Sequence, residues 1–461
     1  MIAWETPYRL LKEEFVQRAD EGCDIPRELR EDFAALDPDA ASTDEVGRIY
    51  DALMTLPADD HLAANAPEDL AAIRRLRPEG PRDLRWKPET AELIDRMHGA
   101  WTGRCVGCAL GKPVEHMGLA RDKAGNLDGR RQIRAYLEQR NAWPLRDYFP
   151  GPQPGDAQRL ICERSWRQNI AYMESDDDLR YTCVGLRVLE DHGPEFTWQD
   201  VARQWVNNIT LPYFCTAERQ AVLNYLERAR YAALDADLPW IRRHRNPYRE
   251  WIGAQIRVDG YAWAAAGKPE LAAAFAYRDA CWTHERNGIY GAMFCAAIEA
   301  AAFVESDPKR LVEIGLSEIP RRCRLAEAVH QCLDWVDFFE DWEPCMGNVE
   351  KTFPQMHTVH TINNALICVL SLFYGEVSTT ETPAIAVMCG LDTDCNSATV
   401  GGIAGAIAGA RKFGENLAQP LNDTLKPEIL SLPESITLTE LAKRHAKVWE
   451  AVDAGYTGPT P

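Results

Sequence analysis

Glycines recur every four residues in two widely separated segments, and this spacing constrains the fold more than any other feature of the chain. They are Gly103, Gly107 and Gly111 in the first segment and Gly401, Gly405 and Gly409 in the second. Glycine inside a helix costs about 1 kcal/mol relative to alanine, so a row of glycines needs a compensating gain. Close approach of a neighbouring backbone supplies one. We therefore predict tightly packed helices at both segments.

Helical periodicity dominates the chain from about residue 89 onward. Leu179, Cys183, Leu186 and Leu189 repeat at helical spacing, and Gly193 follows as a stop signal. The same pattern predicts buried helices over residues 262–277, 289–304, 325–339 and 361–373, and another that runs from the 392–396 region to about Arg411. Alternating strands separated by hairpin turns are absent from the sequence pattern. The predicted fold class is all-α.

The composition divides the chain into three predicted parts. Residues 1–88 form a charged helical extension that prolines interrupt, residues 89–415 form the main domain, and residues 416–461 form a C-terminal helix and tail that pack on the core. Residues 143–158 are rich in Pro and Gly and predict a loop. This loop is interpreted either as a functional lid or as a surface excursion.

The charge balance narrows the range of partners. The 461 residues carry a formal net charge of −19, which disfavours nucleic acid and anionic membranes as partners. We find no apolar signal segment and no membrane-spanning stretch, so a cytoplasmic location is expected. The oligomeric state is left open.

The 14 cysteines predict reduced, buried thiols. Cys105 and Cys108 form a single C-x-x-C, without a second pair to complete a zinc site.

Two acidic segments, at residues 174–178 and 392–394, each precede a helix. Clustered carboxylates repel one another, and a helix N-terminus compensates only about 0.3–1 kcal/mol of that cost. Divalent cations would compensate more, and oxygen ligands select Mg²⁺, Ca²⁺ or Mn²⁺ over zinc. Helix capping remains an alternative for the first segment. An EF-hand is excluded for the second, because Ser397 and Ile403 stand where Gly and Glu are required.

A third segment, residues 103–115, predicts a glycine-rich helix that ends at Pro113. Glu115 follows directly, where a helix dipole disfavours a negative charge. This position predicts either a raised pKa or a polar role for Glu115. His357 and His360 are spaced to share a helix face, and we weigh them as substrate hydrogen-bond donors, as metal ligands and as satisfied core groups.

Taken in order, these segments resemble the ADP-ribosylglycohydrolase family, in particular ADP-ribosyl-[dinitrogen reductase] hydrolase-like enzymes. The family has a G-x-x-x-G-x-A-L-G helix followed by P-x-E, then T-D-D-T, then Asn-Gly, then a G-x-D-T-D helix start. The matching stretches are residues 103–115, 175–178, 287–288 and 390–409. Cys108, Asp178, Phe294 and Cys395 depart from the usual residues, so the chain is a divergent member.

The resemblance implies an orthogonal multi-helix bundle around a binuclear metal site that holds two Mg²⁺ ions or, alternatively, Mn²⁺. The implied metal ligands are Ser175, Asp176, Asp177, Asp392, Asp394 and Cys395, where Cys395 replaces the usual Thr or Ser. The predicted catalytic residues are Glu115, Asp177 and Asp392. The predicted substrate-binding residues are Asn287, Gly288, Tyr290, His357, His360 and Asp178.

Three functions are compatible with these features. The first is metal-dependent hydrolysis of the N-glycosidic bond of a ribosylated small molecule or nucleoside-like substrate. The second is removal of ADP-ribose from a protein or nucleic acid. The third is a non-catalytic binding protein that keeps the fold. We favour the first, because the departures suggest a reshaped pocket and the negative charge disfavours a polyanion.

Overall fold

The computed structural model describes residues 6–156, 158–229 and 234–459, and its regular structure is almost entirely helical. Within these residues the strands are limited to the antiparallel pair β1 (Thr424–Leu425) and β2 (Ile436–Thr437). The all-α prediction is confirmed.

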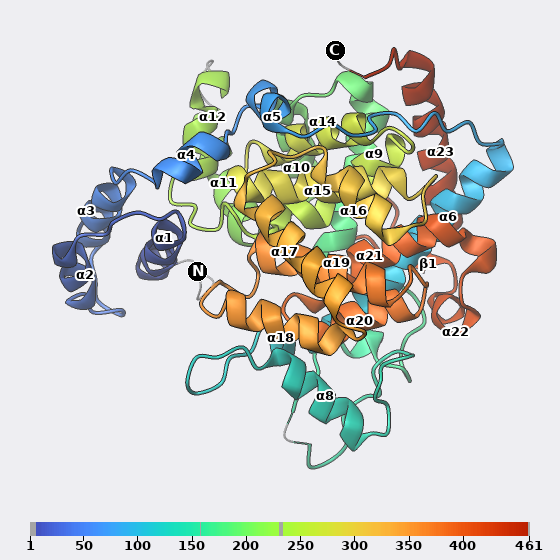
Figure 1. Cartoon of the computed structure of the whole chain (residues 1–461), viewed down its shortest axis with the longest axis horizontal. Coiled ribbons are helices and arrows are strands. Elements are labelled where there is room, and N and C mark those ends of the chain that lie inside the picture. The colour runs from blue at the N-terminus through green and yellow to red at the C-terminus, as the bar shows by residue number, and fades with distance from the viewer. Residues whose placement is uncertain (1–5, 157, 230–233, 460–461) are drawn as a thin grey trace.

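The helices follow one another along the whole described chain (Figure 1). The N-terminal helices are α1 (Pro7–Asp20), α2 (Arg27–Ala34), α3 (Thr43–Met54), α4 (Asp60–Asn65) and α5 (Leu70–Leu76). The central helices are α6 (Thr90–Gly111), α7 (Glu115–Gly118), α8 (Gly129–Gln139), α9 (Asp177–His192), α10 (Trp198–Asn208), α11 (Thr216–Arg228), α12 (Leu234–Arg243), α13 (Asp259–Ala264), α14 (Pro269–Ala280) and α15 (Arg286–Ala301). The C-terminal helices are α16 (Pro308–Leu316), α17 (Arg324–Phe338), α18 (Trp342–Thr352), α19 (Thr361–Tyr374), α20 (Glu381–Cys389), α21 (Thr393–Ala408), α22 (Glu415–Ala418) and α23 (Leu438–Gly455).

Short 3₁₀ turns connect several of these helices. They are η2 (Lys112–Val114), η3 (Glu163–Ser165), η4 (Gly193–Glu195), η5 (Leu211–Tyr213), η6 (Ile252–Arg257), η7 (Ala410–Lys412) and η8 (Gln419–Leu421).

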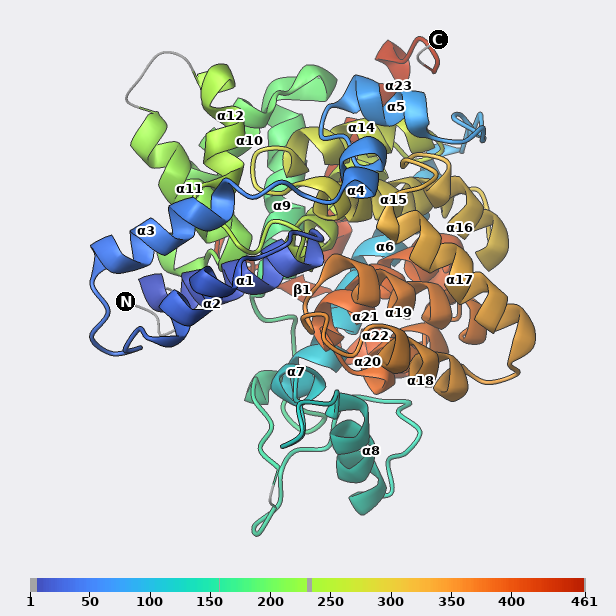
Figure 2. The same ribbon diagram turned by 60° about the vertical axis from the view of Figure 1, so that its left-hand side comes forward.

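Helices α6 and α21 pack backbone to backbone through the centre of the molecule (Figure 2). A Cβ added at Gly103 would lie 1.9 Å from the Gly401 carbonyl oxygen, and one added at Gly405 would lie 2.0 Å from the Gly99 carbonyl oxygen. The predicted tight packing is confirmed, and the two glycine rows prove to be partners. Their contact brings the end of α6 beside the start of α21, because a Cβ at Gly111 would meet the Thr393 carbonyl oxygen.

Two predicted helix boundaries are wrong. The helix expected over residues 262–277 is divided into α13 and α14, because Gly267 has φ +79° and Pro269 starts a new helix. Helix α21 ends at Ala408, before the expected Arg411, because Gly409 takes a left-handed conformation with φ +72°.

The chain between α8 and α9 forms a projection at the bottom of Figure 2, together with α8. The predicted loop over residues 143–158 lies here and has no helix or strand in its described residues. The loop's own Leu145, Tyr148 and Phe149 are buried, so the loop packs on the rest of the protein.

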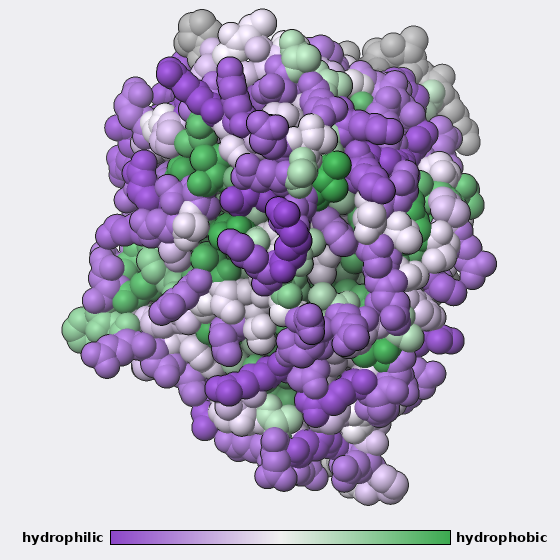
Figure 3. Space-filling view, turned by 90° about the vertical axis from the view of Figure 1, so that its right-hand side faces the viewer, coloured by the Kyte–Doolittle hydropathy of each residue, from purple (hydrophilic) through white to green (hydrophobic). Residues whose placement is uncertain are grey.

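At the C-terminus, α23 packs against α6. The indole of Trp101 donates to His445, and the indole of Trp449 donates to the Ala266 carbonyl. Figure 3 shows the face of the molecule on the right of Figure 1, which is mainly hydrophilic with small separate groups of hydrophobic residues. Among the described helices, none has the length and hydrophobicity needed to cross a membrane.

Candidate metal centre

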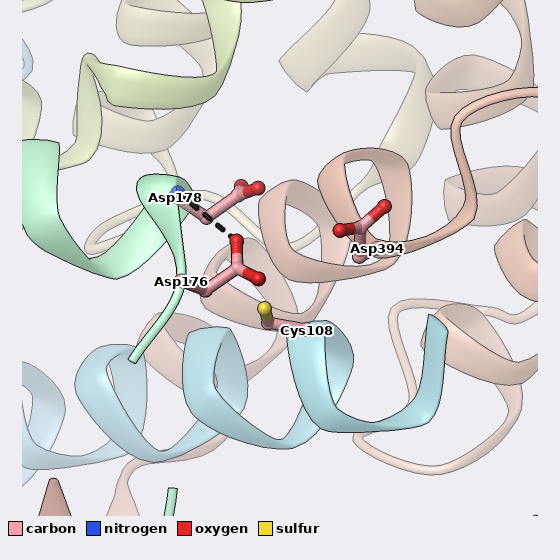
Figure 4. Close-up of side chains that lie close together, drawn as sticks. All are labelled: Cys108, Asp176, Asp178 and Asp394. Carbon is pink, nitrogen blue, oxygen red and sulfur yellow. Dashed lines mark hydrogen bonds between the residues drawn. The ribbon is translucent and has the colours of Figure 1, made fainter. Parts of the chain in front are cut away.

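The ends of three helices bring the two predicted acidic segments together. Asp176 and Asp178 lie at the start of α9, Asp394 lies in the first turn of α21, and Cys108 lies near the end of α6 (Figure 4). Potential ligand atoms of these four side chains all lie within 4.8 Å of one another. Asp392, Asp394 and Cys395 form a second such group. The sequence-distant aspartates therefore converge, as predicted.

Asp176 and Asp392 both occupy N-cap positions but behave differently. The Asp176 side chain accepts a hydrogen bond from the Asp178 backbone N–H, so capping accounts for part of the first segment. The Asp392 side chain caps nothing. Asp392 and Asp394 are buried, and each has one Oδ1 atom without a hydrogen-bond partner among the described residues. An unsatisfied buried carboxylate oxygen is costly, and a cation would satisfy both.

We call Asp176, Asp177, Asp392 and Asp394 the carboxylate cluster. Burial raises the pKa of Asp177 well above its ordinary value, with the charges of Asp176 and Asp394 acting in the same direction. Burial and the charges of Asp394 and Glu115 do the same to the pKa of Asp392. The pKa of Asp394 rises to about 6, mainly through burial. Burial and mutual repulsion thus oppose full ionisation of the cluster, and divalent cations would favour the ionised state.

Two basic residues support the edge of this arrangement. Lys112 Nζ lies 3.2 Å from Asp176 Oδ2 and donates to the Ser175 carbonyl. Burial alone would raise the pKa of Asp176, but the charges of Lys112 and Arg180 and the hydrogen bonds to Asp176 together hold the pKa below its ordinary value. Arg104 pairs with Asp178 at 2.8 Å, and both side chains are fully buried. Neither Lys112 nor Arg104 is among the groups that lower the pKa of Asp392.

The donor set suits a hard or borderline divalent cation. Carboxylate oxygens match Mg²⁺ and Mn²⁺. Cys395 Sγ lies 3.2 Å from Asp178 Oδ2, and burial raises the pKa of Cys395 and of Cys108 well above the ordinary thiol value. A thiol offers a softer ligand, which favours Mn²⁺ more than Mg²⁺.

A cavity of ≈ 1040 Å³ opens onto the carboxylate cluster. All four cluster residues line it, as do Glu115 and Cys395. The repulsion from Asp394 raises the pKa of Glu115 well above its ordinary value, and burial adds to the rise. A raised pKa was predicted from the dipole at the C-terminal end of a helix, but the structure gives a different cause. The chain passes from α6 through η2, and Glu115 is the first residue of α7.

The predicted ligand Ser175 does not point to the cluster. Its hydroxyl donates to the Pro427 carbonyl at 3.2 Å and accepts from Arg180 Nε at 2.9 Å. The cause lies in the neighbouring backbone, because Met173 pairs with the β1 segment and draws this stretch toward residues 424–427. The structure therefore does not bring the Ser175 hydroxyl together with the predicted aspartate ligands.

The predicted substrate residues around the Asn-Gly segment also lie away from the cavity lining. The Asn287 amide donates to Glu250 at 2.7 Å, and its oxygen accepts from the Leu325 N–H. The Tyr290 hydroxyl donates to the Pro67 carbonyl. Gly288 packs against the Arg249 backbone, and a Cβ added at Gly288 would lie 2.6 Å from the Arg249 carbonyl oxygen. In the structure these residues bond to neighbouring parts of the protein and do not line the cavity.

The remaining predicted substrate-binding residues differ in whether they line the cavity. His357 lines the cavity and stacks on Trp251 with 3.9 Å between ring centroids, and burial lowers its pKa to about 4. His360 is buried and caps α19 by accepting from the Ile362 N–H, so the two histidines do not share a helix face. Asp178 is enclosed by its pair with Arg104 and does not line the cavity. Of the predicted substrate-binding residues, His357 alone lines the cavity.

One wall of the cavity contains none of the site residues predicted from the sequence. Residues of the N-terminal extension line it, from α1 and from the turn after α2: Thr6, Tyr8, Arg9, Lys12, Glu13, Pro38 and Asp39. Charged residues on a short amphipathic helix look like a solvent-exposed face, and the sequence alone has no signal that distinguishes the two. The aromatic pair Trp251 and His357 was missed in the same way, because only His357 had been considered.

A sequence model of the ADP-ribosylglycohydrolase family matches residues 89–450, more than half of the chain. The chain belongs to the ADP-ribosylglycohydrolase family. The predicted family resemblance is confirmed, and membership places the protein among glycohydrolases of the ADP-ribosyl type. The match begins after the N-terminal extension, so α1–α5 lie outside it.

A solved structure titled "ADP-ribosylglycohydrolase-related protein complex" is similar to this ADP-ribosylglycohydrolase family member. It shares 19% sequence identity at a TM-score of 0.49, and the match covers 78% of this chain and 99% of that one. No curated protein sequence matches the chain.

Proposed function

We propose that this family member is a metal-dependent hydrolase that cleaves the N-glycosidic bond of a small ribosylated substrate. One observation carries the proposal: two buried aspartates with unsatisfied oxygens border a cavity that Glu115 also lines. Asp176, Asp177, Asp392 and Asp394 would hold two Mg²⁺ or Mn²⁺ ions, with Cys395 at the edge of the site. When bound, such ions polarise ribose hydroxyls and activate water.

The protein's own residues would then position and move the proton. Glu115 has a raised pKa and borders the cluster, so it suits a general base that takes a proton from the attacking water as the C1′–N bond breaks. Lys112 holds Asp176 in place, and the Asn364 side-chain oxygen accepts the Asp392 N–H at 3.2 Å. The Trp251–His357 pair offers a flat surface for the rest of the substrate.

The small-substrate part of the proposal rests on the walls of the cavity. Helix α1 borders it on one side and η6 on another, and the volume matches that of small-ligand sites. A test is to incubate the purified chain with N-ribosides and with ADP-ribosylated peptide, in Mg²⁺, in Mn²⁺ and in EDTA. We expect release of free sugar from N-ribosides that EDTA abolishes. Release from the peptide alone would favour an ADP-ribosyl-protein hydrolase, and no release at all would favour a binding protein.

Replacing Glu115 with Gln is expected to lower kcat by about 10²–10⁴-fold, the usual contribution of a general base. Metal affinity should change little, because Glu115 belongs to neither group of potential ligands. Steady-state kinetics and calorimetric Mn²⁺ titration measure the two effects. E138Q on the exposed side of α8 is the matched control, and an E115Q enzyme with wild-type kcat would remove Glu115 from the mechanism.

A further inference from the structure

Helix α1 forms a wall of the cavity although it lies outside the family match. Resting on the proposed function, we propose that Arg9 and Lys12 of α1 bind an anionic group of the substrate, a phosphate, and so make α1 the specificity element of the site. The substrate class is then a phosphorylated small riboside rather than a neutral nucleoside.

The first support is that α1 is fixed against the main domain by buried charges. Arg249 Nη2 lies 2.8 Å from Glu14 and 2.8 Å from Glu21, and all three side chains are fully buried. Gln17 donates to Glu250 at 3.1 Å, and Glu250 in turn accepts from Asn287. A buried charge without its partner is strongly unfavourable, so this network holds α1 in one position. The Asn-Gly segment thus helps to anchor the wall of the cavity.

The second support is the geometry of the helix. Leu11, Glu14, Arg18 and Glu21 are buried and recur every three or four residues, which marks the face that docks. Residues 8, 9, 12 and 13 lie on the adjacent face, where positions four apart are neighbours, and all four line the cavity. Because the buried face of α1 packs on the main domain, the adjacent face with residues 8, 9, 12 and 13 is directed toward the cavity.

The third support is charge. Among the described residues that line the cavity, Arg9 and Lys12 are the only Lys or Arg side chains, and the other charged ones are acidic. Both are exposed, and neither forms an ion pair within the described residues. A cavity lined with carboxylates repels a phosphate except where a cation lies in its wall. Arg and Lys bind phosphate through charge-assisted hydrogen bonds, so these two side chains define where the anion would sit.

The test compares R9Q/K12Q with R27Q/R30Q in the full chain. Arg27 and Arg30 are exposed on α2 and do not line the cavity. The substrates are one N-riboside with and without a 5′-phosphate. We expect R9Q/K12Q to raise KM for the phosphorylated riboside at least about tenfold, with kcat and the KM of the unphosphorylated one nearly unchanged. R27Q/R30Q should match the wild type. Circular dichroism melting confirms that both variants fold.

Equal effects on the two ribosides, or no effect on either, would overturn the proposal and indicate that Arg9 and Lys12 only offset Glu13 and Asp39. If the wild type cleaves neither riboside, the proposed function fails. Calorimetric measurement of ADP-ribose and ribose binding then still tests whether Arg9 and Lys12 bind a phosphate. Weaker binding of ADP-ribose alone by R9Q/K12Q would then support the anion site, and equal binding to wild type would refute it.

Discussion

Replacing Asp392 and Asp394 together with Asn is expected to abolish metal binding and to lower turnover by at least about 10³-fold. The double variant removes two carboxylates that border the cavity and that each have a buried Oδ1 without a hydrogen-bond partner in the described structure. Metal ions contribute several kcal/mol to transition-state stabilisation, and each 1.36 kcal/mol is a factor of ten in rate. Calorimetric titration with Mn²⁺ and a sugar-release assay measure both losses.

The same variant should fold. The mutual repulsion and burial that raise the pKa of Asp392 and Asp394 are relieved by neutral Asn, so metal-free melting temperature should stay the same or increase. D337N, on the exposed surface of α17, serves as the control. Turnover and Mn²⁺ affinity that survive in the double variant would show that the carboxylate cluster is not the metal site.

Replacing Gly103 with Ala is expected to destabilise the protein by about 3 kcal/mol or to prevent folding. The new Cβ would lie 1.9 Å from the Gly401 carbonyl oxygen, and a backbone cannot move aside as a flexible side chain can. Urea denaturation followed by circular dichroism measures the change in the free energy of unfolding.

Gly347 provides the matched control, because it lies inside α18 and a Cβ there meets nothing within 4 Å. G347A should be neutral or stabilising by up to about 1 kcal/mol, the difference in helix propensity. Equal stabilities of G103A and G347A would contradict the close contact of α6 and α21. Because α6 and α21 also carry Cys108 and Asp394, the same contact positions the candidate metal centre.

Local patterns in the sequence predict much of this fold. Four-residue glycine spacing at 103–111 and 401–409 is visible directly and predicts close helix packing. It does not say which helices meet, since pairing depends on the whole chain. The break at Gly267–Pro269 was overlooked because the alanine-rich stretch before it matches a helix on composition alone.

The site was predicted unevenly for a physical reason. Aspartates at a helix start are positioned by the helix, so the convergence of Asp176, Asp392 and Asp394 follows once the helices pack. Ser175 lies just outside α9, where pairing with β1 determines its direction. The α1 wall depends on ion pairs between residues more than two hundred positions apart, such as Glu14 and Arg249, and no local pattern reveals them.

The most direct test of the central claim is a crystal of the protein soaked in Mn²⁺, examined for anomalous scattering. We expect two peaks within coordination distance of the carboxylate cluster, with Asp176, Asp392 and Asp394 among the ligands. A map without anomalous density there, at Mn²⁺ concentrations that saturate other metal enzymes, would contradict the proposed metal site.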